Sequence, residues 1–339
     1  MNKKRIVVIC PGRGSYSREN SKFLVKYGNS ITEELSFLDL KRKSLGYDTI
    51  TELDNQSFKS QVHMIGENAS PLIYACSLAD YYSIDKEKFE VVAVAGNSMG
   101  WYTALAIASS LDNDDSFNLI QTMGSMMKSK LIGGQIIYPI IDDNWKIDLK
   151  KREFVLKEIK KFNAYVSIFL GGYIVIGGDL NSIKSLLSVL PKNDKYPFQI
   201  PFNGAFHTPL MSSIMDKVNK LSNLLNFRKP RIPIVDGSGK IWLPYSSDLN
   251  QLKKYTLDYQ VNQSYDFSTS IRTCLREFCP DKIVLLGPGN NLGGAIAQII
   301  IENNWFNVNS KETFKIIQNQ NPFLISMSLD DQRKIVCLD

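Results

Sequence analysis

A five-residue turn sets the strongest limit on the fold of this chain. It reads Gly96-Asn97-Ser98-Met99-Gly100 and joins the apolar run 91–95 to the Ala-rich stretch 102–109. A continuous apolar run rich in valine is typical of a strand that is covered on both faces, and the Ala-rich stretch predicts a helix. A serine on such a strand-to-helix turn is lifted out at the end of its strand, beside amides of the helix N-terminus. The turn therefore predicts an α/β fold with Ser98 as a nucleophile.

A serine nucleophile needs a base, and the chain has only two histidines to supply one. His63 lies in a semi-apolar stretch before a helix, which favours a structural role. His207 lies in a loop between a predicted strand and helix, with Gly204 before it and Pro209 after it. This accessible position suits a general base, so we expect His207 to pair with Ser98.

The order of the remaining predicted elements indicates a large and a small unit. Apolar runs at 6–10 and 282–286 predict two more buried strands, each followed by a glycine turn, and Ser70-Pro71 predicts a helix start. From 134 to 200 the pattern predicts strand, helix, strand, strand, helix and strand, which is the ferredoxin-like order. We expect a hydrolase-like large subdomain with a mostly parallel sheet at 1–131 and 201–303, a ferredoxin-like insert at 132–200, and a polar C-terminal appendage at 304–339.

Composition excludes several classes of function. The 339 residues carry a net charge of +6, but the basic residues are scattered and no nucleic-acid motif is present. No run approaches the roughly 18 apolar residues of a membrane span. The five cysteines lack the spacing of a metal site, and their odd number suits a reducing compartment. We expect a cytoplasmic monomer with no bound metal and no nucleic-acid or membrane partner.

Four motifs in order resemble the malonyl-CoA:acyl-carrier-protein transacylase family, which includes the acyltransferase domains of fatty-acid and polyketide synthases. The first is Pro11-Gly12-Arg13-Gly14-Ser15 after the first strand, and the second is the Ser98 turn. The third is Phe206-His207-Thr208-Pro209-Leu210-Met211, and the fourth is Gly287-Pro288-Gly289 after a late strand. The resemblance covers roughly residues 5–303, with the small subdomain inserted at the same place.

The resemblance implies ping-pong acyl transfer without a permanently bound cofactor. Ser98 would take an acyl group from acyl-CoA with His207 as base, and the phosphopantetheine thiol of an acyl carrier protein would then accept it. Backbone amides of Met99 and Arg13 would hold the oxyanion. The backbone carbonyl of Gln260 would orient His207.

Departures from the family pattern leave the identity of the transferred acyl group open. Met123 stands where malonyl-specific members carry a carboxylate-binding arginine, which favours an uncharged acyl group. Arg13 replaces a glutamine beside the same pocket, so its guanidinium could bind a carboxylate from the other side, or could instead face solvent or the CoA phosphates. Asn97 and Trp101 replace a histidine and a glutamate beside the nucleophile, and Phe206 is expected to narrow the pocket toward short chains.

Three alternatives stay open. The same Ser98 and His207 would serve an acyl-carrier-protein thioester hydrolase that removes stalled acyl groups. The altered motifs would also suit a scaffold that binds carrier protein without turnover. An ordinary serine esterase fits less well, since no acidic triad member stands at an obvious strand end between serine and histidine.

Overall fold

A six-stranded sheet forms the centre of the larger part of the molecule in the computed structural model, which describes residues 2–337. Its strands pair in the order β11-β10-β1-β2-β7-β8, and every pair is parallel except the last. This mixed arrangement confirms the predicted α/β class. The strands are β1 (Lys4–Cys10), β2 (Phe89–Gly96), β7 (Ile234–Val235), β8 (Ile241–Trp242), β10 (Lys282–Leu285) and β11 (Leu324–Ser326).

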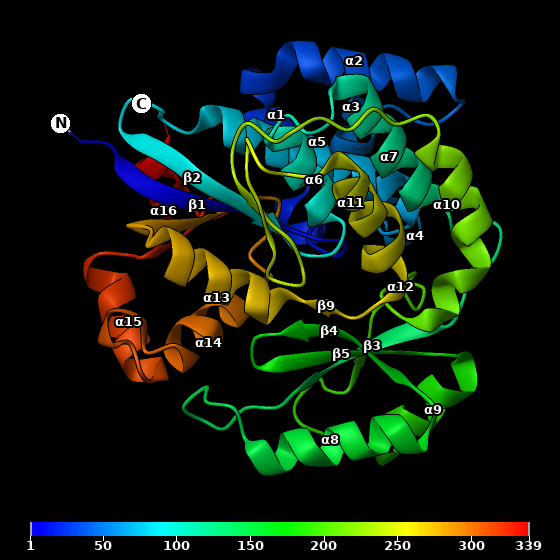
Figure 1. Ribbon diagram of the computed structural model, residues 1–339, viewed down its shortest axis with the longest axis vertical. Coiled ribbons are helices and arrows are strands. Elements are labelled where there is room, and N and C mark those ends of the chain that lie inside the picture. The colour runs from blue at the N-terminus through cyan, green and yellow to red at the C-terminus, as the bar shows by residue number, and fades with distance from the viewer. Residues whose placement is uncertain (1, 338–339) are drawn as a thin grey trace.

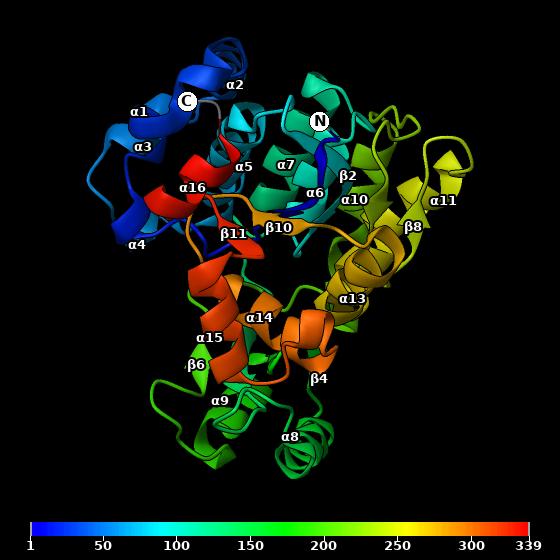
Figure 2. The same cartoon turned by 90° about the vertical axis from the view of Figure 1, so that its left-hand side faces the viewer.

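Helices cover both faces of this sheet because side chains alternate along each strand. On β1, Ile6, Val8 and Cys10 enter one hydrophobic cluster, and Val7 and Ile9 enter another. The first cluster draws on α1 (Phe23–Tyr27), α2 (Thr32–Ser44), α3 (Ile50–Asn55), α5 (Gly66–Ser83), α6 (Gly100–Ile107) and α7 (Asn113–Ser125), with α4 (Ser60–His63) at its margin. The second draws on α13 (Phe267–Phe278) and α14 (Gly293–Glu302), with α15 (Lys311–Gln320) packed outside it (Figure 2).

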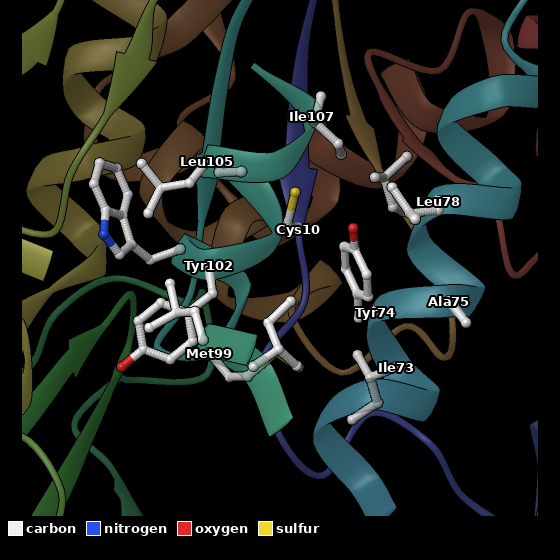
Figure 3. Packing of buried hydrophobic residues seen from close by; sticks show 14 of the residues in the cluster. Cys10, Ile73, Tyr74, Ala75, Leu78, Met99, Tyr102, Leu105 and Ile107 are labelled. Carbon is white, nitrogen blue, oxygen red and sulfur yellow. The ribbon is translucent and has the colours of Figure 1, made fainter. Parts of the chain in front are cut away.

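The C-terminal end of β1 is enclosed between the helix that precedes β2 and the helix that follows it. Figure 3 shows Cys10 with Ile73 and Tyr74 of α5 on one side and Leu105 of α6 on the other. All four side chains are at most 2% exposed. The loops that follow β1 and β2 are thus anchored on a rigid apolar core.

A second sheet of five strands lies at one end of the molecule, with α8 (Leu149–Lys161) and α9 (Leu180–Val189) beside it (Figure 1). Its order is β6-β3-β5-β4-β9. The strands are β3 (Gly134–Pro139), β4 (Tyr165–Leu170), β5 (Tyr173–Gly178), β6 (Phe198–Gln199) and β9 (Tyr265–Asp266). The elements between residues 134 and 199 follow the order expected from the sequence, while β9 joins this sheet from a distant part of the chain.

The interpretation of residues 304–339 as an appendage is wrong for the part that forms β11. This strand pairs in parallel with β10, so it belongs to the central sheet. The following helix α16 (Asp330–Val336) places Arg333 in an ion pair with Asp80, which is fully buried on α5. A strand of three residues between polar segments is too short to leave a hydrophobic pattern.

The expected helix start at Ser70-Pro71 is also wrong, since α5 begins at Gly66 and continues through Pro71. Pro71 has no N–H to donate to the carbonyl of Glu67, four residues earlier. Two side chains donate to that carbonyl instead: Arg42 Nη1 at 2.7 Å and Gln121 Nε2 at 3.1 Å. Tertiary contacts therefore satisfy the carbonyl that proline leaves free, and Ser70 lies one turn inside the helix.

The chain that carries the candidate base and its partner is less regular. A 3-10 helix (Pro209–Ile214) precedes α10 (Met215–Ser222). Later, α11 (Leu249–Lys254) continues through a π-helix (Tyr255–Tyr259) into α12 (Gln260–Asn262). Single π turns of this kind are frequent at functional sites. Among residues 2–337, the helices are all too short or too polar to cross a membrane.

Candidate active site

Ser98 lies on a strained turn that only small neighbours permit. Its φ is 56°, in the left-handed region that a residue with a side chain seldom adopts. A Cβ on Gly96 would lie 2.2 Å from the backbone of Gly100, and one on Gly100 would lie 2.2 Å from the carbonyl oxygen of Cys10. Both glycines are therefore required for β2, the turn and the end of β1 to meet, as a nucleophile turn demands.

The turn brings Ser98 against His207, as predicted. The distance from Ser98 Oγ to His207 Nε2 is 2.7 Å, and His207 Nδ1 lies 2.5 Å from the backbone oxygen of Gln260. His207 also has a left-handed φ of 59°, and its backbone N–H donates to Val261. The three groups form a serine–histidine–carbonyl chain, in which a carbonyl takes the place of the acid of a catalytic triad.

Gln260 holds both members of this pair. Its backbone carbonyl faces His207, while its side-chain Nε2 donates to the backbone oxygen of Ser98 at 3.0 Å. The hydroxyl of Tyr102 donates to Gln260 Oε1 at 3.0 Å and fixes the amide. The π-helix directly before Gln260 delivers this residue to the nucleophile turn.

Burial sets the charge state of the base. His207 is 2% exposed, and burial lowers its pKa to about 4, although its bond to the Gln260 carbonyl acts in the opposite direction. A neutral imidazole with its proton on Nδ1 donates to Gln260 and leaves Nε2 free to accept the hydroxyl proton of Ser98. The arrangement suits a base that is ready at neutral pH.

The backbone amides of Met99 and Arg13 lie beside the nucleophile on two different loops. Met99 directly precedes α6, so its N–H belongs to the free donors of a helix start. A Cβ on Gly12 would lie 2.6 Å from the Asn97 carbonyl oxygen, which shows how closely the loop after β1 approaches the Ser98 turn. Within residues 2–337, neither amide has a described hydrogen-bond acceptor, so both are available to an incoming oxygen.

One cavity of about 490 Å³ contains most of the residues expected at the site. Those that line it are Arg13, Asn97, Ser98, Met99, Met123, Phe206, His207 and Gln260. Trp101 is a correction, since its fully buried side chain lies outside this lining and donates from Nε1 to Thr256 Oγ1. It also packs edge-on against Tyr255, so α6 turns this residue toward the π-helix and away from the acyl pocket.

The Arg13 side chain lies in the cavity, held by backbone oxygens. Its Nη2 donates to the carbonyls of Met64 at 3.2 Å and Phe202 at 2.8 Å, two residues that are far apart in the sequence. Burial lowers the pKa of Arg13 to about 10, which leaves the guanidinium charged at neutral pH. Its Nε is buried without a partner.

The cavity also holds polar residues that the sequence reasoning missed. Gln135 on β3 is buried, and its Nε2 donates to Ser167 Oγ at 2.6 Å and to the Phe206 carbonyl at 3.1 Å, beside the base. Ser70 presents a buried hydroxyl without a partner. A glutamine at the start of an apolar strand and a serine in a predicted helix start carry no signal of a binding role, so neither was a candidate.

The structure offers no metal centre at the site. Among residues 2–337, no group of three or more histidine, cysteine or acidic side chains could hold a metal ion. His63 lies away from the cavity, where its Nε2 is 2.9 Å from the Leu53 carbonyl oxygen and its ring stacks on Tyr16.

Comparison with known proteins gives a consistent picture, although no model of a protein family matches the chain. A malonyl-CoA–acyl-carrier-protein transacylase of Bacillus subtilis is 22% identical over 299 residues, covering 87% of this chain and 90% of the relative. The solved structure of an acyl-carrier-protein S-malonyltransferase of Burkholderia pseudomallei superposes with a TM-score of 0.76 at 19% identity, covering 98% of both chains. A malonyl-transacylase solved in complex with its type II polyketide acyl carrier protein gives 0.69 at 18% identity, covering 88% of this chain and 93% of that one. The resemblance found in the four motifs is thereby confirmed: in sequence and in fold, the chain is similar to malonyl-CoA:acyl-carrier-protein transacylases.

Proposed function

We propose that this chain is an acyltransferase that moves a malonyl or other short acyl group from coenzyme A to the thiol of an acyl carrier protein. The single observation that carries the proposal is the 2.7 Å contact between Ser98 Oγ and His207 Nε2, in a cavity beside two free backbone amides. The names of the relatives supply the donor and the acceptor.

In the first half-reaction, Ser98 Oγ attacks the thioester carbonyl carbon and its proton passes to His207 Nε2. The carbonyl oxygen becomes an oxyanion, which accepts hydrogen bonds from the Met99 and Arg13 amides. The C–S bond then breaks, and the leaving thiolate takes the proton from Nε2. An ester on Ser98 and free coenzyme A result.

The second half-reaction reverses these steps with a different thiol. His207 Nε2 takes the proton of the carrier's phosphopantetheine thiol, whose sulfur attacks the ester carbonyl. Collapse of the second tetrahedral intermediate breaks the C–O bond, and Ser98 Oγ recovers its proton from Nε2. Neither half-reaction in this proposal uses a metal or a resident cofactor. The five free cysteines suit the reducing conditions of the cytoplasm, where we propose that the protein acts.

A two-stage transfer assay tests the proposal. Brief incubation with malonyl-CoA and with acetyl-CoA should acylate the wild-type protein, and removal of the donor followed by addition of holo-carrier protein should pass the group on. Ser98→Ala should accept no acyl group. His207→Gln should slow acylation by about 100-fold or more, since general-base catalysis contributes that much.

The acceptor decides between transfer and hydrolysis. If the ester on Ser98 is the acyl-enzyme intermediate of a transferase, it should persist much longer in buffer alone than in the presence of carrier protein. An ester that decays in water at the same rate with and without carrier protein would contradict the transferase proposal and favour the thioester hydrolase.

A further inference from the structure

Two residues that line the cavity carry buried polar atoms with no hydrogen-bond partner among residues 2–337. In the described part of the chain, Arg13 Nε and Ser70 Oγ are both buried without a hydrogen-bond partner, and both residues line the pocket that holds Ser98. A buried donor left unpaired is costly, so two of them in one pocket indicate a ligand that completes them.

Both groups lie beside the point where α5 and α7 come into close contact. A Cβ on Gly66 would lie 2.2 Å from the Gly124 oxygen and 3.3 Å from Arg13 Nη1. A Cβ on Gly124 would lie 3.1 Å from the Ser70 Cβ. The guanidinium and the hydroxyl therefore flank the same pair of glycines, and Met123 lies next to them on α7.

The guanidinium is held in position and its charge is unmatched. Its two described hydrogen bonds both leave from Nη2 and end on carbonyls, so Nε and Nη1 keep free donors. Within residues 2–337 no carboxylate forms an ion pair with Arg13, and the charge of Glu67 acts on it only beyond ion-pair distance, since the ion pair of Glu67 is with Lys128. Lys195 also lines the cavity, but it is exposed to solvent. Arg13 is therefore the cation whose charge is available inside the pocket.

We propose that Arg13 and Ser70 form the receptor for a carboxylate at the far end of the acyl group, so that the substrate class is a dicarboxylic acyl thioester such as malonyl-CoA. This inference rests on the proposed acyl transfer. The charged guanidinium, through a free N–H, and the serine hydroxyl supply donors that a carboxylate accepts, and charge-assisted bonds of this kind are strong. An uncharged acyl group would leave both groups unpaired.

The position of the receptor fits an acyl chain attached to Ser98. The Asn97 N–H donates to the Cys10 carbonyl at 3.0 Å, and Gly12 packs directly on Asn97. Arg13 follows Gly12 and Ser98 follows Asn97, so both side chains enter the cavity from two backbone segments that are in contact. A short acyl chain can therefore span from the serine ester to the guanidinium.

The test is the ratio of acylation rates with malonyl-CoA and acetyl-CoA, measured by intact-protein mass at single turnover. We expect Arg13→Gln to lower the malonyl-to-acetyl ratio by about 10- to 100-fold, since hydrogen bonds to charged groups are lost. Ser70→Ala should lower it by about 3- to 10-fold, as one neutral donor is removed. The matched control is Arg18→Gln, which removes an exposed arginine from the following 3-10 helix and should leave the ratio unchanged.

The outcomes separate this inference from the proposed function. A wild-type protein that no thioester acylates contradicts the acyltransfer itself. A wild-type protein that takes acetyl and refuses malonyl, or an Arg13→Gln ratio equal to the wild-type ratio, overturns the receptor alone. Should Arg13→Gln lose acylation with both donors, Ser70→Ala decides: a lowered ratio supports the receptor, and an unchanged ratio overturns it.

Discussion

The acylation rate of Ser98 should stay nearly constant from pH 8 down to about pH 5, because His207 remains neutral over that range. Burial of the imidazole lowers its pKa from 6.5 to about 4. At pH 5.5, about 97% of a histidine with the lower pKa is neutral, against about 9% of one with an ordinary pKa. The two cases therefore differ by roughly tenfold in rate at that pH.

The assay is kcat/KM for acylation, which reports ionisation of the free enzyme. Acetyl-pantetheine is the suitable donor, since it carries no group that titrates in this range. Short reaction pulses after a pH jump, quenched and read by intact mass, give the rate before the protein can unfold. An apparent pKa near 6.5 would refute the reasoning from burial.

Stability is a less direct readout of the same group. Between pH 4 and 6.5 the unfolded chain would bind a proton that folded His207 excludes, so this group makes stability rise with pH, by up to about 3 kcal/mol. Asp80 acts in the opposite direction, because burial raises its pKa to about 6 and the folded state retains its proton. The two contributions partly cancel, which is why the rate is the better measurement.

Two further predictions concern the framework. Arg333→Met should lower the free energy of unfolding, measured in urea, by about 3–5 kcal/mol, because it leaves Asp80 buried without its partner. The double variant with Asp80→Asn should recover part of the loss. A loss below about 1 kcal/mol for Arg333→Met would show that α16 is not part of the core. Gly100→Ala should abolish acylation, since its Cβ would lie 2.2 Å from the Cys10 carbonyl oxygen. The control Gly294→Ala on α14 places its Cβ in open space and should be tolerated. Both variants are measured for stability and for acylation of Ser98. Equal behaviour of the two alanine variants would contradict the close packing of the turn.

Local pattern was enough to predict that Ser98 and His207 pair. The Ser98 turn has its signal within a few residues, in the change from an apolar strand to a helix. With only two histidines in the chain, and His63 in a semi-apolar stretch before a helix, His207 followed almost by elimination. The Gln260 carbonyl came from the family resemblance, because no local pattern marks a backbone oxygen as a partner.

The features that sequence reasoning missed depend on contacts between distant segments. Helix α5 continues through Pro71 because side chains from α2 and α7 satisfy the free carbonyl of Glu67. Strand β11 is recognisable only beside β10. Near the nucleophile, the directions of the Trp101 and Ser70 side chains follow from how their helices are rotated, which residue identity alone does not determine.

Peptide mapping of the trapped acyl-enzyme tests the central claim most directly. Wild-type protein is quenched in acid after a brief exposure to malonyl-CoA, digested, and compared with Ser98→Ala treated in the same way. We expect one malonyl group on the peptide that contains Ser98, its absence from the variant, and its loss when holo-carrier protein is added before the quench. A malonyl group on another residue, or the same adduct on Ser98→Ala, would contradict the account.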